Sequence, residues 1–282
     1  MTAADVDPAV IEMVDRSMVD FYVQGRRRPW ADIKIDDDVV WGATGLPLQA
    51  FNGAVGATFS DSTADVRIET VLDYYRELKL DMSWWVGPTS PAWLGERLVA
   101  HGLVDDGVAP GMAVSLDGWS APPLPDGVEI ELTHDAASFH DAMDVMFEGF
   151  EMPRDVQPLF EERFRGYSIE PGATSRTFVA RLDGRPIATS LGATLDGIVA
   201  IYNVATVAAA RRRGAGAAVT AAAMADAQAA GARWAILESS EMGRSVYERL
   251  GFRQVAEVAI FAGNFSEESG APETPRGRHP TG

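Results

Sequence analysis

The chain of 282 residues contains no cysteine. This absence excludes disulfide bridges, thiolate zinc sites and a cysteine nucleophile, and it gives no support for export into an oxidising compartment. The four histidines are scattered and show neither metal-ligand spacing nor a Ser/Asp partner pattern. They are His101, His134, His140 and His279. We expect no metal site and no Ser-His-Asp triad, and we expect these histidines to be incidental to function.

Basic residues are also scarce. There are 24 lysines and arginines against 41 aspartates and glutamates, which gives a formal net charge of −17. Neither half is basic, with 9 basic against 19 acidic residues through position 125 and 15 against 22 beyond it. Because nucleic acids and anionic membranes bind positive surfaces, we expect neither as a partner. The charge favours a small cationic or neutral amine as ligand, and a monomer and a homodimer both remain possible.

Long apolar runs are missing as well. The longest uncharged run, residues 39–60, is interrupted by four glycines, Pro47 and Asn52 in a pattern typical of strands and turns. We therefore expect no membrane span. The first 16 residues are acidic and lack the layout of a signal peptide, which predicts a cytoplasmic protein. Hydrophobic residues at 46% and charged residues at 23% are typical of a folded globular chain.

The length permits two domains, and the composition indicates where they divide. Residues 119–127 contain three prolines and a glycine, which predicts a linker. Residues 264–282 have little apolar surface to bury, which predicts a disordered tail. We therefore expect an N-terminal domain over 1–118 and a second domain over 128–263.

The second half has a regular order of predicted elements. Three strands joined by Asp-Gly turns are predicted at 177–182, 187–195 and 198–207, which indicates an antiparallel meander. A helix at 217–230 closed by Gly231, a strand at 234–238, a short helix at 243–250 and a last strand at 255–261 are predicted to follow. The unit of strand, helix and strand predicts a right-handed crossover between parallel strands.

The first half carries a faint copy of this order. Residues 81–98 align with residues 233–250 without a gap and share the tripeptide Glu-Arg-Leu, and residues 64–78 predict the matching helix. We interpret this as a duplication, with a chance alignment as the alternative. The first copy lacks the Arg/Gly loop and has Gly95 where the second copy has Tyr247.

The loop at residues 205–218 is the strongest candidate for a binding site. It lies between a predicted strand and a helix N-terminus, where unpaired amides and the helix dipole favour an anion. Gly214 and Gly216 permit close approach of a pyrophosphate, and three consecutive arginines precede them. The alternative is that the small residues serve helix packing and that the arginines form a solvated run.

Other phosphate loops match this segment less well. A Walker loop needs Gly-Lys-Ser/Thr, which is absent. A dinucleotide-binding loop needs a small residue where Val219 stands and a glycine directly after the strand. Because Glu238 ends the next strand, as a ribose-binding acid would, dinucleotide binding stays a minor alternative.

Two motifs in order give a family resemblance. Arg211-Arg-Arg-Gly-Ala-Gly216 precedes the predicted helix, and Tyr247-Glu-Arg-Leu-Gly-Phe252 follows the next strand. With these motifs the sequence resembles the GCN5-related N-acetyltransferases (GNAT) over residues 128–262, and over residues 20–117 it resembles a degenerate copy of the same fold. The resemblance implies an α/β (α+β) protein of two tandem GNAT-like domains. Each would be a mixed twisted sheet flanked by helices, and the second would have splayed central parallel strands.

The resemblance also implies acetyl-CoA as co-substrate and residues to hold it. The pantetheine arm would follow Val204, Ala205, Thr206 and Val207. The pyrophosphate site would contain Arg211, Arg212, Arg213, Gly214, Ala215, Gly216 and Ala217. Ser240 stands where the family often has asparagine, beside the cofactor. Tyr247 would donate a proton to the leaving sulfur, with simple core packing as its alternative role.

The general base is the weakest part of the resemblance. Glu238 is the first candidate for deprotonating an ammonium acceptor, and Glu148, Glu151 and Asn203 are the others. The implied reaction is direct attack of a small-molecule primary amine on acetyl-CoA, without a covalent enzyme intermediate and without a metal. A non-catalytic acyl-CoA-binding sensor or partner module, and a transferase that uses another acyl-CoA, are the alternatives.

Overall fold

The computed structural model describes residues 8–25, 28–170, 173 and 175–266, so the predicted tail lies outside the described residues from position 267 on. The described residues form two compact units, the first from 8–111 with 255–266 and the second from 112–254. Strands β5 (Val104–Ser115) and β11 (Arg253–Gly263) each contribute residues to both units. The structure therefore divides the chain within these two strands, whereas the sequence placed the division at 119–127.

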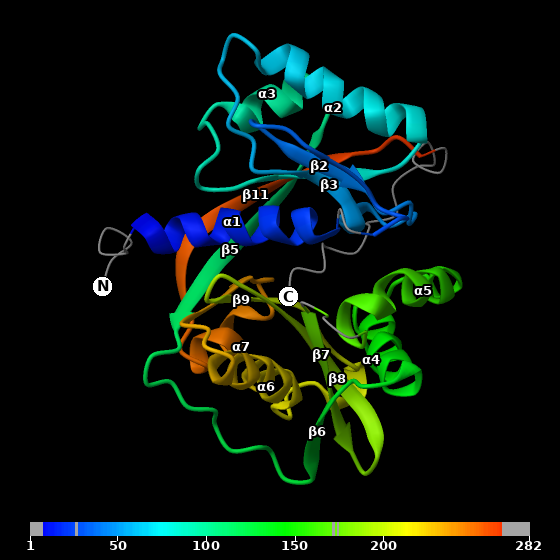
Figure 1. Ribbon diagram of the computed structural model, residues 1–282, viewed down its shortest axis with the longest axis vertical. Coiled ribbons are helices and arrows are strands. Elements are labelled where there is room, and N and C mark those ends of the chain that lie inside the picture. The colour runs from blue at the N-terminus through cyan, green and yellow to red at the C-terminus, as the bar shows by residue number, and fades with distance from the viewer. Residues whose placement is uncertain (1–7, 26–27, 171–172, 174, 267–282) are drawn as a thin grey trace. The chain divides into compact units, whose positions relative to one another are not determined.

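The second unit is a mixed sheet with helices on both faces. Its strand order is β5-β10-β9-β8-β7-β6. Figure 1 shows α6 on one face of the β7–β8 region and α4 with α5 on the other. Its elements are β6 (Val128–Leu132), α4 (Ala136–Gly149), the 3-10 turn η3 (Arg154–Val156), α5 (Gln157–Ser168), β7 (Ser175–Leu182), β8 (Arg185–Leu195), β9 (Ile198–Thr206), η4 (Ala208–Ala210), α6 (Ala215–Ala229), β10 (Trp234–Glu238) and α7 (Arg244–Arg249).

The predicted meander is confirmed. Strands β7, β8 and β9 pair antiparallel in chain order. Asp183 and Gly184 in the first turn have φ angles of 50° and 75°, and the Asp-Gly pair of the second turn has φ angles of 49° and 79°. Two consecutive positive φ angles are those of a two-residue type I′ turn, in which aspartate and glycine are favoured. Local sequence chemistry therefore sets the register of this part of the sheet.

The predicted crossover is confirmed as well. Strand β10 pairs parallel with β9, and the alanine-rich α6 connects them. Gly231 has a φ angle of 97° just past the helix, and the amide of Ala232 donates to the carbonyl of Ala227. This is the left-handed termination that glycine at C′ provides.

The segment predicted as a linker begins with a docked tryptophan. The indole Nε1 of Trp119 donates to the carbonyl of Leu250 at 3.0 Å, and Gln228 in α6 donates to the carbonyls of Leu116 and Trp119. Residues 120–124 are exposed. Residues 116–119 are thus part of the second unit, since they are held against α6 and the end of α7.

The first unit repeats the element order of the second unit in shortened form. Its strand order is β1-β2-β3-β4-β11-β5. One apolar core lies under α2 and α3 and a second one lies under α1. Its remaining elements are α1 (Pro8–Gly25), β1 (Asp32–Ile35), β2 (Val40–Ala43), η2 (Gln49–Phe51), β3 (Asn52–Val55), α2 (Ala64–Leu78), β4 (Met82–Val86) and α3 (Leu94–Ala100).

The structure supports the interpretation of the repeat as a duplication. Strand β4 begins at Met82 and β10 begins at Trp234, which are aligned positions of the two copies. The predicted matching helix at 64–78 is α2, and β3 pairs parallel with β4 as β9 pairs with β10.

Within the described ranges no helix is both long and apolar enough to cross a membrane.

His101 joins α3 to α2 in the first unit. Its Nδ1 lies 2.5 Å from a carboxylate oxygen of Glu69, and its Nε2 lies 2.9 Å from one of Asp65. Partial burial lowers the pKa of His101, but the hydrogen bonds and charges of Asp65 and Glu69 outweigh it, so the pKa is raised. The protonated imidazole therefore stabilises the folded unit.

This ion pair predicts a pH dependence of stability. Because the folded pKa of His101 lies above its unfolded value near ~6.5, the stabilisation is fully present below about pH 6 and is lost as the pH rises through the folded pKa. We expect at most about 1 kcal/mol, since the carboxylates are largely exposed. Urea midpoints of His101→Gln should lose this pH dependence, whereas those of His134→Gln, a control at an exposed histidine, should retain it. Equal pH slopes in the wild type and His101→Gln would contradict the prediction.

Candidate functional site

A bulge interrupts β9 near its end. Tyr202 pairs with Leu191 and Ala205 pairs with Thr189, so two residues of β9 stand against one residue of β8. Asn203 is one of the two, and its φ angle of 55° is in the left-handed region. A bulge of this kind bends the strand and leaves ladder groups unpaired, which makes them available to a ligand.

The pairing between β9 and β10 ends before either strand does. It joins Trp234 to Ile198, Ala235 to Val199 and Ile236 to Ala200. The remaining residues, 201–206 of β9 and 237–238 of β10, have no partner across this seam in the described ladder. The expected splay of the two central parallel strands is therefore present.

The N-terminus of α6 lies beside the end of β9. Gly214 is its N-cap residue with a φ angle of 83°, and no side chain caps the helix. The first amides of α6 have no acceptor within the helix. A Cβ atom added to Gly216 would lie 3.1 Å from Oγ1 of Thr206. These amides and the end of β9 are thus close enough to contact one ligand.

The three consecutive arginines differ in their surroundings. All three are exposed. Arg211 donates from Nε to the carbonyl of Thr206 at 3.3 Å and from Nη2 to the carbonyl of Gly149 at 3.2 Å. For Arg212 and Arg213, no side-chain hydrogen bond or ion pair occurs within the part of the chain that the structure describes. Arg212 has a φ angle of 65°.

Tyr247 is buried in α7. Its side chain is only 2% exposed, and its ring packs edge-on against Phe252 with centroids 6.0 Å apart. Burial raises the pKa of the phenol, so the hydroxyl is protonated at neutral pH. Among the described residues its hydroxyl has no hydrogen-bond partner. Both a packing role and a donor role fit this position.

Glu238 and Ser240 lie at the junction of β10 and α7. Glu238 is the last residue of β10 and is 6% exposed. The Oγ of Ser240 accepts from the amide of Gly243 at 3.0 Å, and its carbonyl accepts from the amides of Gly243 and Arg244. Ser240 therefore closes the turn that precedes α7, a local role that its sequence position did not reveal.

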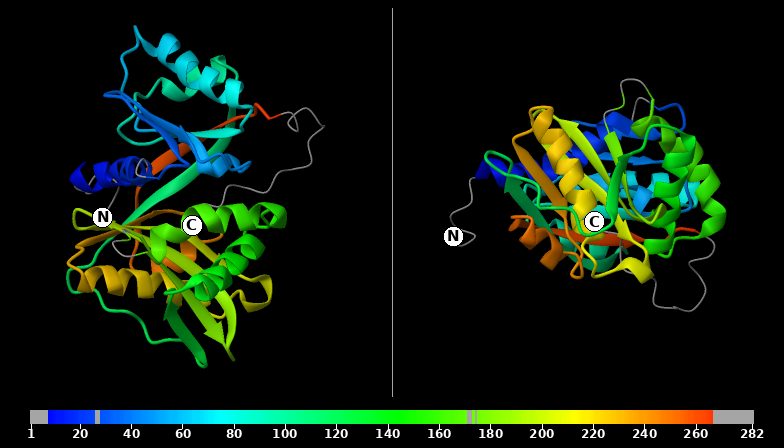
Figure 2. Two further views of the ribbon diagram at one scale, coloured as in Figure 1. Left: turned by 45° about the vertical axis from the view of Figure 1, so that its right-hand side comes forward. Right: turned by 90° about the horizontal axis from the view of Figure 1, so that it is seen from below.

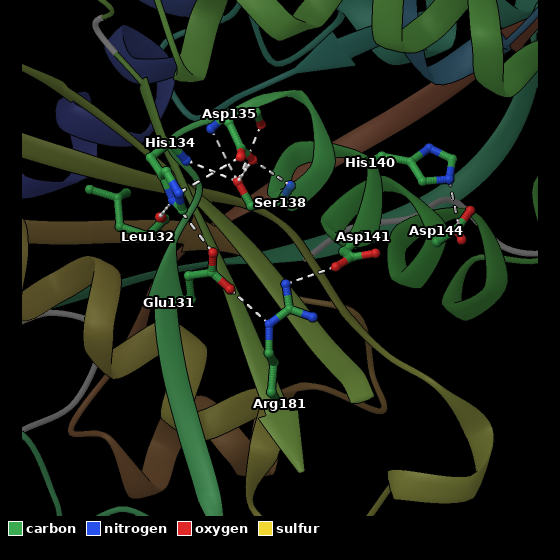
Figure 3. Close-up of polar contacts among 9 residues, drawn as sticks. All are labelled: Glu131, Leu132, His134, Asp135, Ser138, His140, Asp141, Asp144 and Arg181. Carbon is green, nitrogen blue, oxygen red and sulfur yellow. Dashed lines mark hydrogen bonds and ion pairs between the residues drawn. The ribbon is translucent and has the colours of Figure 1, made fainter. Parts of the chain in front are cut away.

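Helix α4 is fixed at its N-terminus by a polar cluster, which Figure 3 shows. Asp135 and Ser138 form a reciprocal capping box. Arg181 in β7 donates to Glu131 and to Asp141, both at 2.7 Å. These bonds tie α4 to the two outer strands. The direction of α4 is therefore set by side chains at its N-terminal end, although its C-terminal end is the one that reaches β9.

The histidines near this cluster are engaged in ion pairs. His134 Nδ1 lies 3.4 Å from Glu131, and His140 Nδ1 lies 2.8 Å from Glu161. The hydrogen bond to Glu161 raises the pKa of His140. The described residues include no group of three or more histidines and carboxylates suited to a metal ion.

The C-terminal turn of α4 reaches the end of β9. A Cβ atom added to Gly149 would lie 2.9 Å from the Cβ of Ala205 and 3.3 Å from the amide nitrogen of Thr206. Glu148 and Glu151, on either side of Gly149, are exposed. Sequence reasoning missed Gly149, and the available signal was a glycine at the end of an otherwise apolar helical pattern.

The structure thus brings several predicted residues together and leaves others apart. Contacts join Thr206 to Gly216 and, through Arg211 and Gly149, to the end of α4. Glu238 ends β10, the strand next to β9, and Tyr247 lies in the helix that follows. The arrangement can hold an anion at the start of α6 and an extended ligand between the parted strands.

The comparison with protein families identifies one domain. Residues 124–237 match the family model described as "Acetyltransferase (GNAT) domain". This range contains the bulge, the arginines and the start of α6, and it ends one residue before Glu238. No curated protein matches the chain.

Solved structures are similar over nearly the whole chain. A GCN5-related N-acetyltransferase from Kribbella flavida has a TM-score of 0.72 and 21% identity, over 89% of this chain and 95% of that one. One from Sphaerobacter thermophilus has a TM-score of 0.61 and 15% identity, over 94% of each chain. A tandem GNAT protein from the clavulanic acid biosynthesis pathway has a TM-score of 0.55 and 13% identity, over 89% and 88%. The predicted fold class, two tandem GNAT-like domains, is confirmed.

The contact at Gly149 predicts the effect of a larger residue. Gly149→Val should separate the end of α4 from Ala205 and destabilise the second unit by about 1–3 kcal/mol, since the clash is with a side chain of a central strand. Urea denaturation would measure this. Glu148→Val adds a β-branched residue at the exposed neighbouring position and should change stability by less than about 1 kcal/mol. A Gly149→Val protein as stable as Glu148→Val would contradict the close approach.

Proposed function

We propose that the chain is an acetyltransferase of the GNAT family, and that it transfers an acetyl group from acetyl-CoA to the primary amine of a small molecule. The match of residues 124–237 to the GNAT domain model supports acyl transfer in general. One observation carries the specific proposal: the strands β9 and β10 part directly beside the uncapped N-terminus of α6. A long ligand with an anionic middle fits this combination.

The donor would lie across both features. Its pantetheine arm follows Val204–Val207 and pairs with backbone groups that the bulge and the splay leave available. Its pyrophosphate rests on the amides of residues 212–217, at the positive end of the α6 dipole. Arg212 and Arg213 add positive charge there in a chain whose net charge is −17.

The proposed reaction is a direct displacement. The amine nitrogen attacks the thioester carbonyl carbon, and a backbone N–H of the bulged strand stabilises the developing oxyanion. The C–S bond then breaks, and Tyr247 donates a proton to the leaving sulfur. The acetylated nitrogen loses its second proton to the phenolate, which gives the neutral amide and restores the phenol. Glu238 accepts the proton that the ammonium group must lose before attack. The products are an N-acetyl amine and CoA.

The charge around α4 favours a cationic acceptor. Glu148 and Glu151 are exposed beside Gly149, which lies against the end of β9. The carbonyl end of a helix also carries partial negative charge. A small amine with a positive group fits this side better than an acidic one. The quaternary state, and the absence of nucleic-acid and membrane partners, stay predictions from the sequence.

The first unit is proposed to have a structural role. A Cβ atom at Gly95, the position aligned with Tyr247, would meet the ring of Phe261 at 2.7 Å. Side chains of α1 also fill the space just past β3 and β4, where Val19 packs against Gly56 and Asp15 against Gly87. The features that would hold and cleave a thioester in the second unit are therefore replaced by packing in the first.

The proposal is tested by thiol release from acetyl-CoA with a panel of amino acids, polyamines, aminoglycosides and peptide N-termini. We expect release with at least one cationic amine. CoA binding in calorimetry without release for any amine would favour the acyl-CoA-binding module, and no binding at all would overturn the proposal. Thermal shifts across acyl-CoAs identify the donor, because the preferred one stabilises the fold most.

Tyr247→Phe separates a transferase from a binding module. We expect turnover to fall by roughly 10²-fold or more, as for loss of a general acid, while the Kd for CoA stays within about twofold. Tyr167→Phe is the control, since Tyr167 is also buried in the second unit. Unchanged turnover in Tyr247→Phe would show that the residue is only part of the core.

A further inference from the structure

The carbonyl of Gly149 is an acceptor that its own helix cannot satisfy. The residue four positions later is Pro153, which has no N–H to donate. The amides just after Gly149 donate to other carbonyls of the helix: that of Phe150 donates to Met146, and that of Met152 donates to Phe147. The guanidinium of Arg211 supplies the missing donor at 3.2 Å.

The same guanidinium also binds the end of β9. Its Nε donates to the carbonyl of Thr206 at 3.3 Å while Nη2 binds Gly149. The planar fork of arginine can bridge two acceptors with fixed geometry, which the single ammonium of lysine cannot. Arg211 therefore joins the last turn of α4 to the strand that ends at the α6 loop.

We propose that Arg211 is a positioning residue that holds the C-terminal turn of α4 against β9 and transmits donor binding to that turn. Arg212 and Arg213, whose side chains make no hydrogen bond or ion pair within the described ranges, supply the charge for the phosphates. The inference rests on the proposed function, because the ligand it invokes is coenzyme A.

The coupling follows from chain geometry. Arg211 directly precedes Arg212, whose φ angle of 65° turns the backbone into the start of α6. A pyrophosphate bound to those amides restrains this backbone, and the Arg211 side chain extends from it to Gly149. Ordering the loop thus orders the α4 turn, where Glu148 and Glu151 face the acceptor in the proposed reaction.

Amide hydrogen exchange of the full chain, with and without saturating CoA, tests this inference. In the wild type we expect CoA to slow exchange at Phe150 and Met152, in the α4 turn. In Arg211→Ala, at a CoA concentration that calorimetry shows to saturate the variant, the slowing at these two amides should be lost. Arg211→Lys should not restore it.

Arg213→Ala is the matched control in the same run of arginines. It should weaken CoA binding by roughly fivefold, as expected for one exposed charge pair of about 1 kcal/mol. At saturation it should still show slowed exchange in the α4 turn. A purely structural role of Arg211 would raise exchange equally with and without CoA, so the CoA-dependent difference separates the two.

Two results would overturn the inference. One is CoA binding to the wild type without any change at Phe150 and Met152, and the other is a full CoA-dependent change in Arg211→Ala. No CoA binding to the wild type in calorimetry would instead overturn the proposed function itself, so the two failures are distinguishable.

Discussion

The pairing of β9 with β10 stops after three residue pairs, and the candidate site depends on that stop. Continued pairing would satisfy the backbone groups of both strands and leave nothing for a ligand to bind. The bulge at Asn203 turns β9 away from the regular ladder just where the two strands part. The loop before α6 follows β9, and α7 follows β10, so both begin at the end of the sheet where the strands part.

Figure 2 shows α4 (green) and α6 (yellow) on opposite faces of the sheet of the second unit. An end of each helix lies against the end of β9, and the two ends have opposite polarity. The N-terminus of α6 lies against Thr206 through Gly216, and the C-terminus of α4 lies against Ala205 through Gly149. The first end favours an anion and the second a cation. An anionic donor and a cationic acceptor fit this arrangement. Glycine at both contacts permits the two helix ends to lie close to β9.

The two units share one order of strands and helices but differ in how the space beside the parallel strands is filled. Each has a parallel strand pair connected by a helix and followed by a short second helix. In the first unit α1 packs directly against Gly56 and Gly87, beyond the paired strands, and Phe261 fills the space beside Gly95. Packing therefore replaces the open seam, and the unit has no counterpart of the arginine loop.

The sequence alone determined the meander, the crossover and the repeat, because Asp-Gly turns and an alanine-rich helix act within a few residues, and the phosphate loop stays a prediction from its Arg/Gly motif. Only the tertiary structure distinguishes the three arginines by their contacts. The three are equivalent by type, and Arg211 differs because Gly149, 62 residues away, has a carbonyl that Pro153 cannot satisfy. The tertiary structure alone also revealed the division of the chain within β5 and β11 and the ion pairs of His101. These features join residues that lie far apart in the sequence, so no local sequence pattern predicts them.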